Sequence, residues 1–246
     1  MSDENKQKTT QGKFVKGDNY LVKQQITQPC EHKFDGAIKV AEYIVEEIKR
    51  NVKSNQVNNM RYMNDYEGRL NEWKKLPLWQ RMFTPIPKPM TIEAMAIWTE
   101  RVFAGRPWDH KGYIIKAFKE FAVERVEYSN YTKGLRTYKS HFHKYKNYDC
   151  RYDIWSNIHY GYVGLSAGFS QELLLKGSNL AQVLDNSGDN DPIDDITAIK
   201  IGFTLFEKFG NFAEKLTYHD VFKEILSKSN SDFPDARKVH ICLEKK

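Results

Sequence analysis

Apolar residues recur at helical spacing along much of the chain. Between residues 36 and 54 they predict one amphipathic helix, with Asp35 placed to cap it and an apolar face of Phe34, Ile38, Ala41, Ile44, Val45, Ile48 and Val52. The same period predicts helices at 59–75, 91–104, 113–128, 170–175, 194–209 and 218–228. We expect Thr91 and Thr217 to cap two of these helices, and Gly177 and Gly210 to end two others.

Breaks in this pattern predict the remaining elements. Four prolines exclude a regular helix from residues 77–89 and indicate an extended crossing loop. Residues 129–151 are rich in Tyr and Lys and predict a loop or a short hairpin, while 239–243 could form a short strand. We therefore predict a mostly α fold (α+β with minor strands). Residues 34–246 would form a single compact helical domain, and the polar residues 1–33 a flexible N-terminal arm.

Charge and cysteine content add limits to this picture. The 246-residue chain carries a net charge of +6, and Lys111–Arg151 holds ten basic residues against four acidic ones, interleaved with tyrosines. Such a segment can bind a phosphate-bearing polymer, or face the acidic stretch 181–195. The three cysteines lie far apart without a C-x-x-C pair, which argues against a cysteine zinc site and predicts free thiols and synthesis in the cytoplasm. No apolar run reaches the roughly 18 residues of a membrane span.

Two short segments concentrate residues that could do chemistry. Pro107–Lys111 places Trp108, Asp109, His110 and Lys111 side by side just after a predicted helix end. An acid, an imidazole and an ammonium beside a large aromatic can hold a proton-transfer group. A capping aspartate beside a surface histidine is the structural alternative.

The second segment, Tyr152–Gly164, combines polar, aromatic and glycine residues. If a turn separates Asp153 from His159, the carboxylate can orient the imidazole or share a metal with it. The expected substrate-binding residues are Lys111, Trp108, Tyr152, Trp155, Ser156, Asn157, Tyr160 and Tyr162. The alternative is that the aromatic residues belong to the core and the glycines serve packing.

These segments resemble a known family. PWDHK, YDIWSNIHYGYVG followed by GFS, and the later DNDPIDD are similar to the bacterial toxin 44 domain of polymorphic toxins. The resemblance implies a secreted antibacterial effector with a cognate immunity protein and a secretion-system carrier. It implies candidate site positions at Trp108, Asp109, His110, Lys111, Asp153, His159, Asp191 and Asp194. Of these we expect Asp153, His159, Asp109 and His110 to be catalytic, and Asp191 and Asp194 to hold a divalent cation if one is bound. Asn190 stands where an acidic residue is expected before Asp191.

Three functions remain open at this point. The favoured one is a hydrolase that attacks peptidoglycan or its lipid-linked precursor in the periplasm. Asp153 and His159 have a spacing similar to a short colicin M pattern, although Cys150 and Tyr160 depart from it, and a glycan-cleaving version would pair Asp153 with Asp191 or Asp194. The second is a nuclease, acting on RNA in the target cytoplasm through His110 and His159, with Lys111 as the charge stabiliser. The third is a non-enzymatic binding module.

Overall fold

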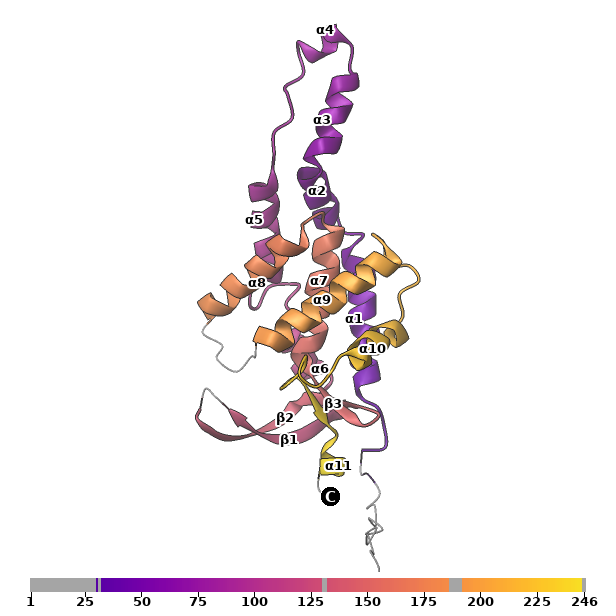
Figure 1. Cartoon of the computed structure of the whole chain (residues 1–246), viewed down its shortest axis with the longest axis vertical. Coiled ribbons are helices and arrows are strands. Elements are labelled where there is room, and N and C mark those ends of the chain that lie inside the picture. Colours follow the sequence, from indigo (N-terminus) through magenta and orange to yellow (C-terminus); the bar gives the residue numbers. More distant parts are fainter. Residues whose placement is uncertain (1–29, 31, 130–131, 186–191, 245–246) are drawn as a thin grey trace, which may run out of the picture.

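The computed structural model describes Cys30 and residues 32–129, 132–185 and 192–244. This part of the chain contains mostly helices and one four-stranded sheet, which confirms the predicted fold class (Figure 1). Its α-helices are α1 (Ala37–Asn51), α2 (Asn55–Asn64), α3 (Tyr66–Lys75), α4 (Leu78–Arg81), α5 (Thr91–Val102), α6 (Lys111–Ala117), α7 (Tyr152–Ser166), α8 (Gln171–Asp185), α9 (Pro192–Phe209), α10 (Tyr218–Ser227) and α11 (Ile241–Glu244). A 3-10 helix, η1 (Lys119–Phe121), precedes the strands β1 (Ala122–Ser129), β2 (Gly134–Tyr145), β3 (Tyr148–Arg151) and β4 (Arg237–Val239).

The core forms where α1, α7 and α9 pack together above the sheet (Figure 1). Most of the apolar stripe predicted for α1 is buried, since Val40, Ala41, Ile44 and Ile48 have no exposed surface, but Phe34 precedes the helix and is 82% exposed. α7 buries eleven of its fifteen residues, so it is the central helix of the body. Its polar side chains are therefore held by neighbouring helices more than by solvent.

Two glycines let α7 and α9 approach closely. A Cβ added at Gly161 of α7 would lie 2.2 Å from the carbonyl oxygen of Ile199. A Cβ at Gly202 of α9 would lie 2.4 Å from the carbonyl oxygen of Ile158. Backbone cannot yield as a side-chain tip can, so the crossing requires glycine at both positions. The close crossing also brings the first turns of the two helices, which carry the polar residues, side by side.

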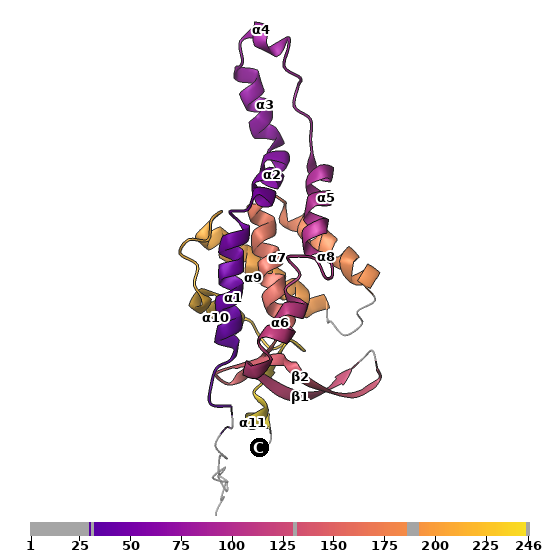
Figure 2. The same ribbon diagram turned by 180° about the vertical axis from the view of Figure 1, so that it is seen from behind.

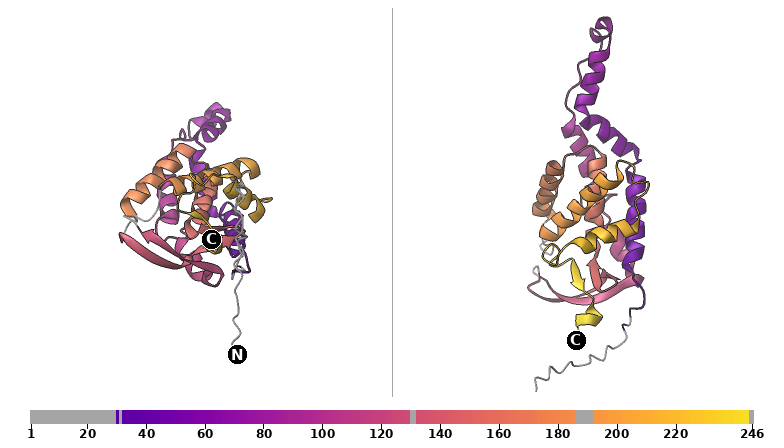
Figure 3. Two further views of the ribbon diagram at one scale, coloured as in Figure 1. Left: turned by 60° about the horizontal axis from the view of Figure 1, so that its bottom comes forward. Right: turned by 45° about the vertical axis from the view of Figure 1, so that its right-hand side comes forward.

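The sheet lies at the base of the helical body, and its strands follow one another in the order β1-β2-β3-β4 (Figures 1 and 3). All its pairs are antiparallel, with Phe142 opposite Arg151 and Cys150 opposite Arg237. The predicted helix at 113–128 is therefore wrong beyond residue 117, because β1 occupies Ala122–Ser129. The hairpin alternative for 129–151 is confirmed within the described residues.

Residues 55–102 form a helical projection that rises away from the sheet (Figures 1 and 2). The helix predicted for 59–75 is divided at Asp65, whose side chain caps α3 by accepting from the Gly68 amide at 3.0 Å. α3 buries no residue. The extended return through the prolines is confirmed except for the single turn α4, where Leu78 and Trp79 are exposed.

Of the remaining predictions, about helix ends and the C-terminal strand, some are confirmed and others are wrong. The capping box of Thr217 and Asp220 opens α10 as expected. Thr91 is the first residue of α5 and not its cap, because Met90 occupies the cap position without a side-chain hydrogen bond. α8 continues past Gly177, which the sequence analysis takes as its end, and the 239–243 strand is replaced by β4 and α11. Within the described residues, none of the helices has the length and apolar content that crossing a membrane requires.

Candidate functional site

Asp153 and His159 lie on one continuous helix, so the turn that would bring the two side chains together is absent. Six residues on an α-helix correspond to about 9 Å of rise and about 120° of rotation. The two side chains therefore diverge, and each is buried with different partners: Asp153 is 1% exposed and His159 has no exposed surface. The site consists of two neighbouring polar groups, one around each residue.

His159 belongs to the first group, which we call the imidazole pair, His110 and His159. Their ring centroids are 4.3 Å apart in an edge-to-face arrangement. Burial lowers the pKa of His110 to about 4, although the nearby Asp109 charge acts in the opposite direction. Burial and the neighbouring His110 lower the pKa of His159 well below its usual value. Both rings are thus neutral at pH 7.

Three polar residues on one face of α1 position the imidazole pair. The Tyr43 hydroxyl lies 2.9 Å from Nδ1 of His110, and the Asn51 side-chain amide nitrogen lies 2.9 Å from Nε2 of His159. Glu47, 6% exposed, stands between them and accepts a 3.5 Å hydrogen bond from Asn51. This Tyr-Glu-Asn stripe interrupts the α1 pattern at four-residue spacing. That spacing is the sequence signal that could have revealed these partners.

The second group is an acidic cluster of Asp153, Asp194 and Asp195. Arg151 donates to Asp153 through Nε at 2.9 Å and through a terminal nitrogen at 2.6 Å. Burial alone would raise the pKa of Asp153, but the charge and hydrogen bonds of Arg151 outweigh it and lower the pKa. Asp153 is therefore ionised, with the guanidinium fixed beside it.

Asp194 and Asp195 behave in the opposite way. Burial raises the pKa of Asp194 to about 7, although hydrogen bonds from backbone amides oppose the shift. Burial also raises the pKa of Asp195, and the Asp153 charge adds to this while Lys111 opposes it. Asn157 of α7 donates a 2.5 Å hydrogen bond to Asp195, which ties the two helices together at the cluster. The cluster therefore combines an ionised carboxylate with carboxyl groups inclined to stay protonated.

The PWDHK segment lies beside both groups. Asp109 caps it, since its two oxygens accept from the Gly105 amide at 2.9 Å and the Lys111 amide at 3.2 Å. Trp108, 6% exposed, packs edge to face with His159 at 6.2 Å. The half-buried Lys111 places its charge near Asp153 and Asp195. The structure thus brings this segment next to α7, as the sequence analysis expects, with Asp109 in the capping role that was the alternative.

The substrate-binding residues predicted on α7 divide into two sets. Trp155 and Tyr162 have no exposed surface and belong to the apolar core, so a direct substrate contact for them is wrong. Tyr162 also donates a 2.7 Å hydrogen bond to the Gly210 carbonyl. Ser156 is buried, whereas Tyr152, Asn157 and Tyr160 are half-buried. A substrate contact therefore stays a prediction for the half-buried Tyr152, Asn157 and Tyr160.

The predicted acidic metal site is only partly described. Asp191 lies outside the described residues, and Asp194 accepts from the Asp235 amide at 3.2 Å. Among the described residues, the side chains that gather as potential metal ligands are Cys30, His32, His240 and Cys242. A divalent cation at Asp191 and Asp194 therefore stays a prediction.

Comparison with known proteins agrees with the resemblance seen in the sequence. The profile of the family described as bacterial toxin 44 matches residues 97–208. This range contains PWDHK, all of α7 and both acidic residues of the first turn of α9. Searches of curated proteins and of solved structures found no match.

Residues 97–208, a little less than half of the chain, are therefore similar to the bacterial toxin 44 family. The imidazole pair and the acidic cluster come from this segment, whereas the α1 residues that position the imidazoles lie outside it. Sequence reasoning missed Asp195, Arg151 and the α1 stripe as parts of the site.

Proposed function

We propose that this toxin is a hydrolase that cleaves the glycan of peptidoglycan in the periplasm of the target cell, through its acidic cluster. The observation that carries the proposal is the opposite direction of the pKa shifts of Asp153 and Asp195 within one cluster. Glycoside hydrolysis needs one protonated and one ionised carboxyl group on either side of the scissile bond. Arg151 and burial supply this difference.

In this mechanism Asp195 is the general acid that protonates the leaving oxygen. Asn157, which donates to one of its oxygens at 2.5 Å, fixes the orientation of the carboxyl group. As the glycosidic bond breaks, water adds to the anomeric carbon and gives a proton to the Asp153 carboxylate, which faces the developing positive charge on the sugar ring. Lys111 balances the charge of the Asp195 carboxylate that is left. The half-buried Lys111, Asn157 and Tyr152 form the surface side of the cluster and would contact the polymer.

His159 then has a positioning role and not the role of a general base. A general base is effective when its pKa lies near the working pH, and the pKa of His159 is lowered well below its usual value. With His110 it supports the α6 and α7 segments that carry Lys111 and Asp153. The spacing similar to colicin M therefore does not translate into a shared Asp–His unit.

A nuclease is the second candidate, and the imidazole pair is the observation that favours it. Two adjacent histidines can act as acid and base on a phosphodiester. A general acid at neutral pH, however, needs a pKa near 7, and that of His110 is about 4. We therefore rank the nuclease below the glycan hydrolase.

The compartment of action separates these candidates. The toxin would be expressed with and without an export signal, as wild type, Asp195→Asn and His159→Gln. The glycan hydrolase predicts lysis only after export, and new reducing ends in purified peptidoglycan, both lost in Asp195→Asn. Killing from the cytoplasm with loss of RNA would refute the glycan-hydrolase proposal. Cleavage of the lipid-linked precursor in place of the polymer would show that the proposed substrate is wrong. We also propose a cognate immunity protein and a secretion-system carrier as partners, as the toxin family suggests.

A further inference from the structure

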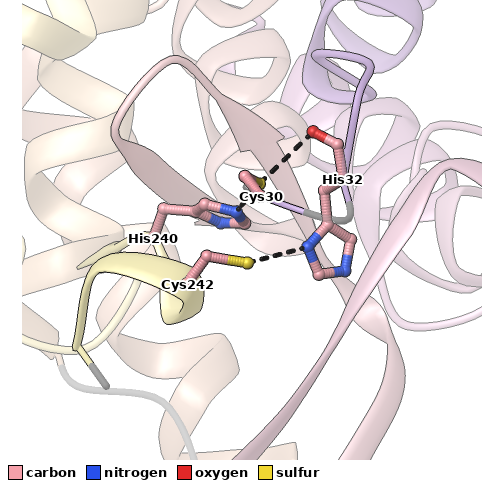
Figure 4. Close-up of side chains that lie close together, drawn as sticks. All are labelled: Cys30, His32, His240 and Cys242. Atoms are coloured by element: carbon pink, nitrogen blue, oxygen red, sulfur yellow. Dashed lines mark hydrogen bonds between the residues drawn. The ribbon is translucent and has the colours of Figure 1, made fainter. Parts of the chain in front are cut away.

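We infer that Cys30, His32, His240 and Cys242 form a structural zinc site that joins the segment before α1 to the segment after β4 (Figure 4). The four candidate ligand atoms lie within 4.8 Å of one another. All four residues lie outside the family-matched range 97–208 and outside the acidic cluster. The site therefore adds to the proposed function and does not depend on it.

The donor set is the one that zinc prefers. Two thiolates and two imidazoles in a tetrahedral arrangement are typical of structural Zn²⁺ sites. The spacing is Cys-x-His at one end of the described chain and His-x-Cys at the other. Four protein ligands leave no open position for water or substrate, so such a site is structural and not catalytic.

The distances between the ligand atoms suit a shared ion. With bonds of about 2.3 Å to sulfur and 2.0–2.1 Å to nitrogen, a tetrahedral zinc places sulfur and nitrogen about 3.5 Å apart. Cys242 Sγ lies 3.5 Å from Nδ1 of His32, and Cys30 Sγ lies 3.1 Å from Nε2 of His240. Figure 4 shows the two thiols and the two rings facing one another from opposite chain segments.

An acidic residue behind the cluster fixes the orientation of one ligand. Nδ1 of His240 lies 2.6 Å from Oδ1 of Asp149, which is fully buried. Because this nitrogen carries the proton toward the carboxylate, Nε2 is left with its lone pair directed at the cluster. A carboxylate–histidine–metal arrangement of this kind is common in zinc sites.

The carboxylate is itself held in place by the sheet. Arg125 of β1 donates to Asp149 at 2.6 Å and to the Val239 carbonyl at 2.9 Å, and the Ile241 amide donates to Asp149 at 3.1 Å. Arg125 also pairs with Glu244 of α11 at 2.7 Å. The C-terminal half of the site is therefore preorganised by the protein, and Cys30 and His32 complete it.

Metal analysis of the purified protein tests the proposal. Wild type, the double variant Cys30→Ser/Cys242→Ser and the control Cys150→Ala would be purified in reductant without chelator, and bound metals measured by plasma mass spectrometry. Cys150 is buried in β3 and is not part of the cluster. We expect about one zinc ion per chain in wild type and in the control, and a loss of at least tenfold in the double variant.

A second measurement covers the case in which the double variant fails to fold. Wild type stripped of metal would be titrated with Co²⁺, and one equivalent should give the visible d–d bands and the thiolate charge-transfer band of a tetrahedral sulfur–nitrogen site. Zinc should displace the cobalt and raise the melting temperature. Absence of both bound zinc and the cobalt spectrum, or zinc retained equally by the double variant, would overturn the proposal.

Discussion

His110 and His159 are in edge-to-face contact, with their ring centroids 4.3 Å apart, inside a part of the protein that excludes water from both. Neither Nε2 of His110 nor Nδ1 of His159 has a hydrogen-bond partner among the described residues. A second proton on either ring would place a positive charge in this environment. The pair is therefore stable only while both rings remain neutral.

The first prediction concerns acid stability. In the unfolded chain His110 titrates near 6.5, and in the folded protein burial lowers its pKa to about 4. Between these values the unfolded state binds more protons, so the free energy of unfolding should fall as pH drops from about 6.5 to about 4, by up to about 3 kcal/mol for this residue. Urea unfolding at a series of pH values measures this.

The control is His110→Asn, whose side chain can still bond to Tyr43 but does not titrate. In this variant the slope of the free energy of unfolding against pH should decrease by the contribution of about one proton. His143, which has a similarly lowered pKa of about 4, continues to contribute to the slope. Equal slopes for wild type and variant would contradict the burial of a neutral His110.

The second prediction compares two neighbouring aspartates. Asp195→Asn keeps an oxygen that can accept from Asn157 but removes the acidic proton, so glycan cleavage should fall by about 10²- to 10⁴-fold. Asp194→Asn is the matched control, because Asp194 also has a raised pKa but contacts the Asp235 amide instead. Release of reducing ends from peptidoglycan gives the comparison.

Stability provides an independent check on the same two variants. When folding raises the pKa of a carboxyl group, the folded state binds an extra proton. The group then stabilises the protein at low pH, and this stability is lost as pH rises from about 4 through the folded pKa. For Asp194 this window ends at about 7. Each Asn variant should therefore unfold at higher urea concentration than wild type at pH 8. An unchanged or lower urea midpoint in both variants would show that burial does not keep either carboxyl group protonated.

The third prediction concerns the glycine crossing. Gly161→Ala would bring a methyl group to 2.2 Å from the Ile199 carbonyl, so α7 and α9 must separate. We expect a loss of at least 1–3 kcal/mol in stability and weaker toxicity, because Asn157 and Asp195 would also move apart. Gly112→Ala, where a methyl group meets nothing within 4 Å, should leave both unchanged within about 0.5 kcal/mol. Thermal unfolding of the two variants measures this difference, and equal stability of both would contradict the prediction.

The fourth prediction distinguishes a core tyrosine from a substrate contact. Tyr162→Phe removes the hydrogen bond to the Gly210 carbonyl and should cost about 1 kcal/mol, with the cleavage rate per folded molecule unchanged. Tyr152→Phe, on the half-buried side of α7, should change the apparent affinity for polymer instead. A fall in the cleavage rate per folded molecule in Tyr162→Phe would refute the assignment of Tyr162 to the core.

The helical body could be predicted because its apolar residues keep one period over several turns, as along α1 and α9. β1 could not be recognised, because its pattern is inverted: Arg125 and Ser129 are buried whereas Val126 and Tyr128 are exposed. Arg125 is tolerated inside because three carboxylates pair with it: that of Glu127, two residues away on the same strand, and those of the distant Asp149 and Glu244. The pattern of apolar and polar residues along the sequence does not show these long-range ion pairs.

The site was predictable in part for similar reasons. Local composition identifies His110 and His159, but the pairing of Asp153 with His159 requires a turn between them, and the structure has a continuous helix there. The Cys/His cluster has only two short local signals, Cys30-x-His32 and His240-x-Cys242, and nothing in the sequence joins them. Cys30 and Cys242 are 212 positions apart, and only the fold brings them together.

The place of this cluster has a mechanical consequence. Cys30 and His32 precede α1, and His240 and Cys242 follow β4, so among the described residues the four ligands enclose almost all of the helices and strands. With zinc bound, a pulling force would pass from one segment to the other through metal–thiolate bonds and bypass the helices and strands in between. Mechanical unfolding of the domain would then require release of the ion, so a chelator or a competing thiol should lower the force that the domain resists.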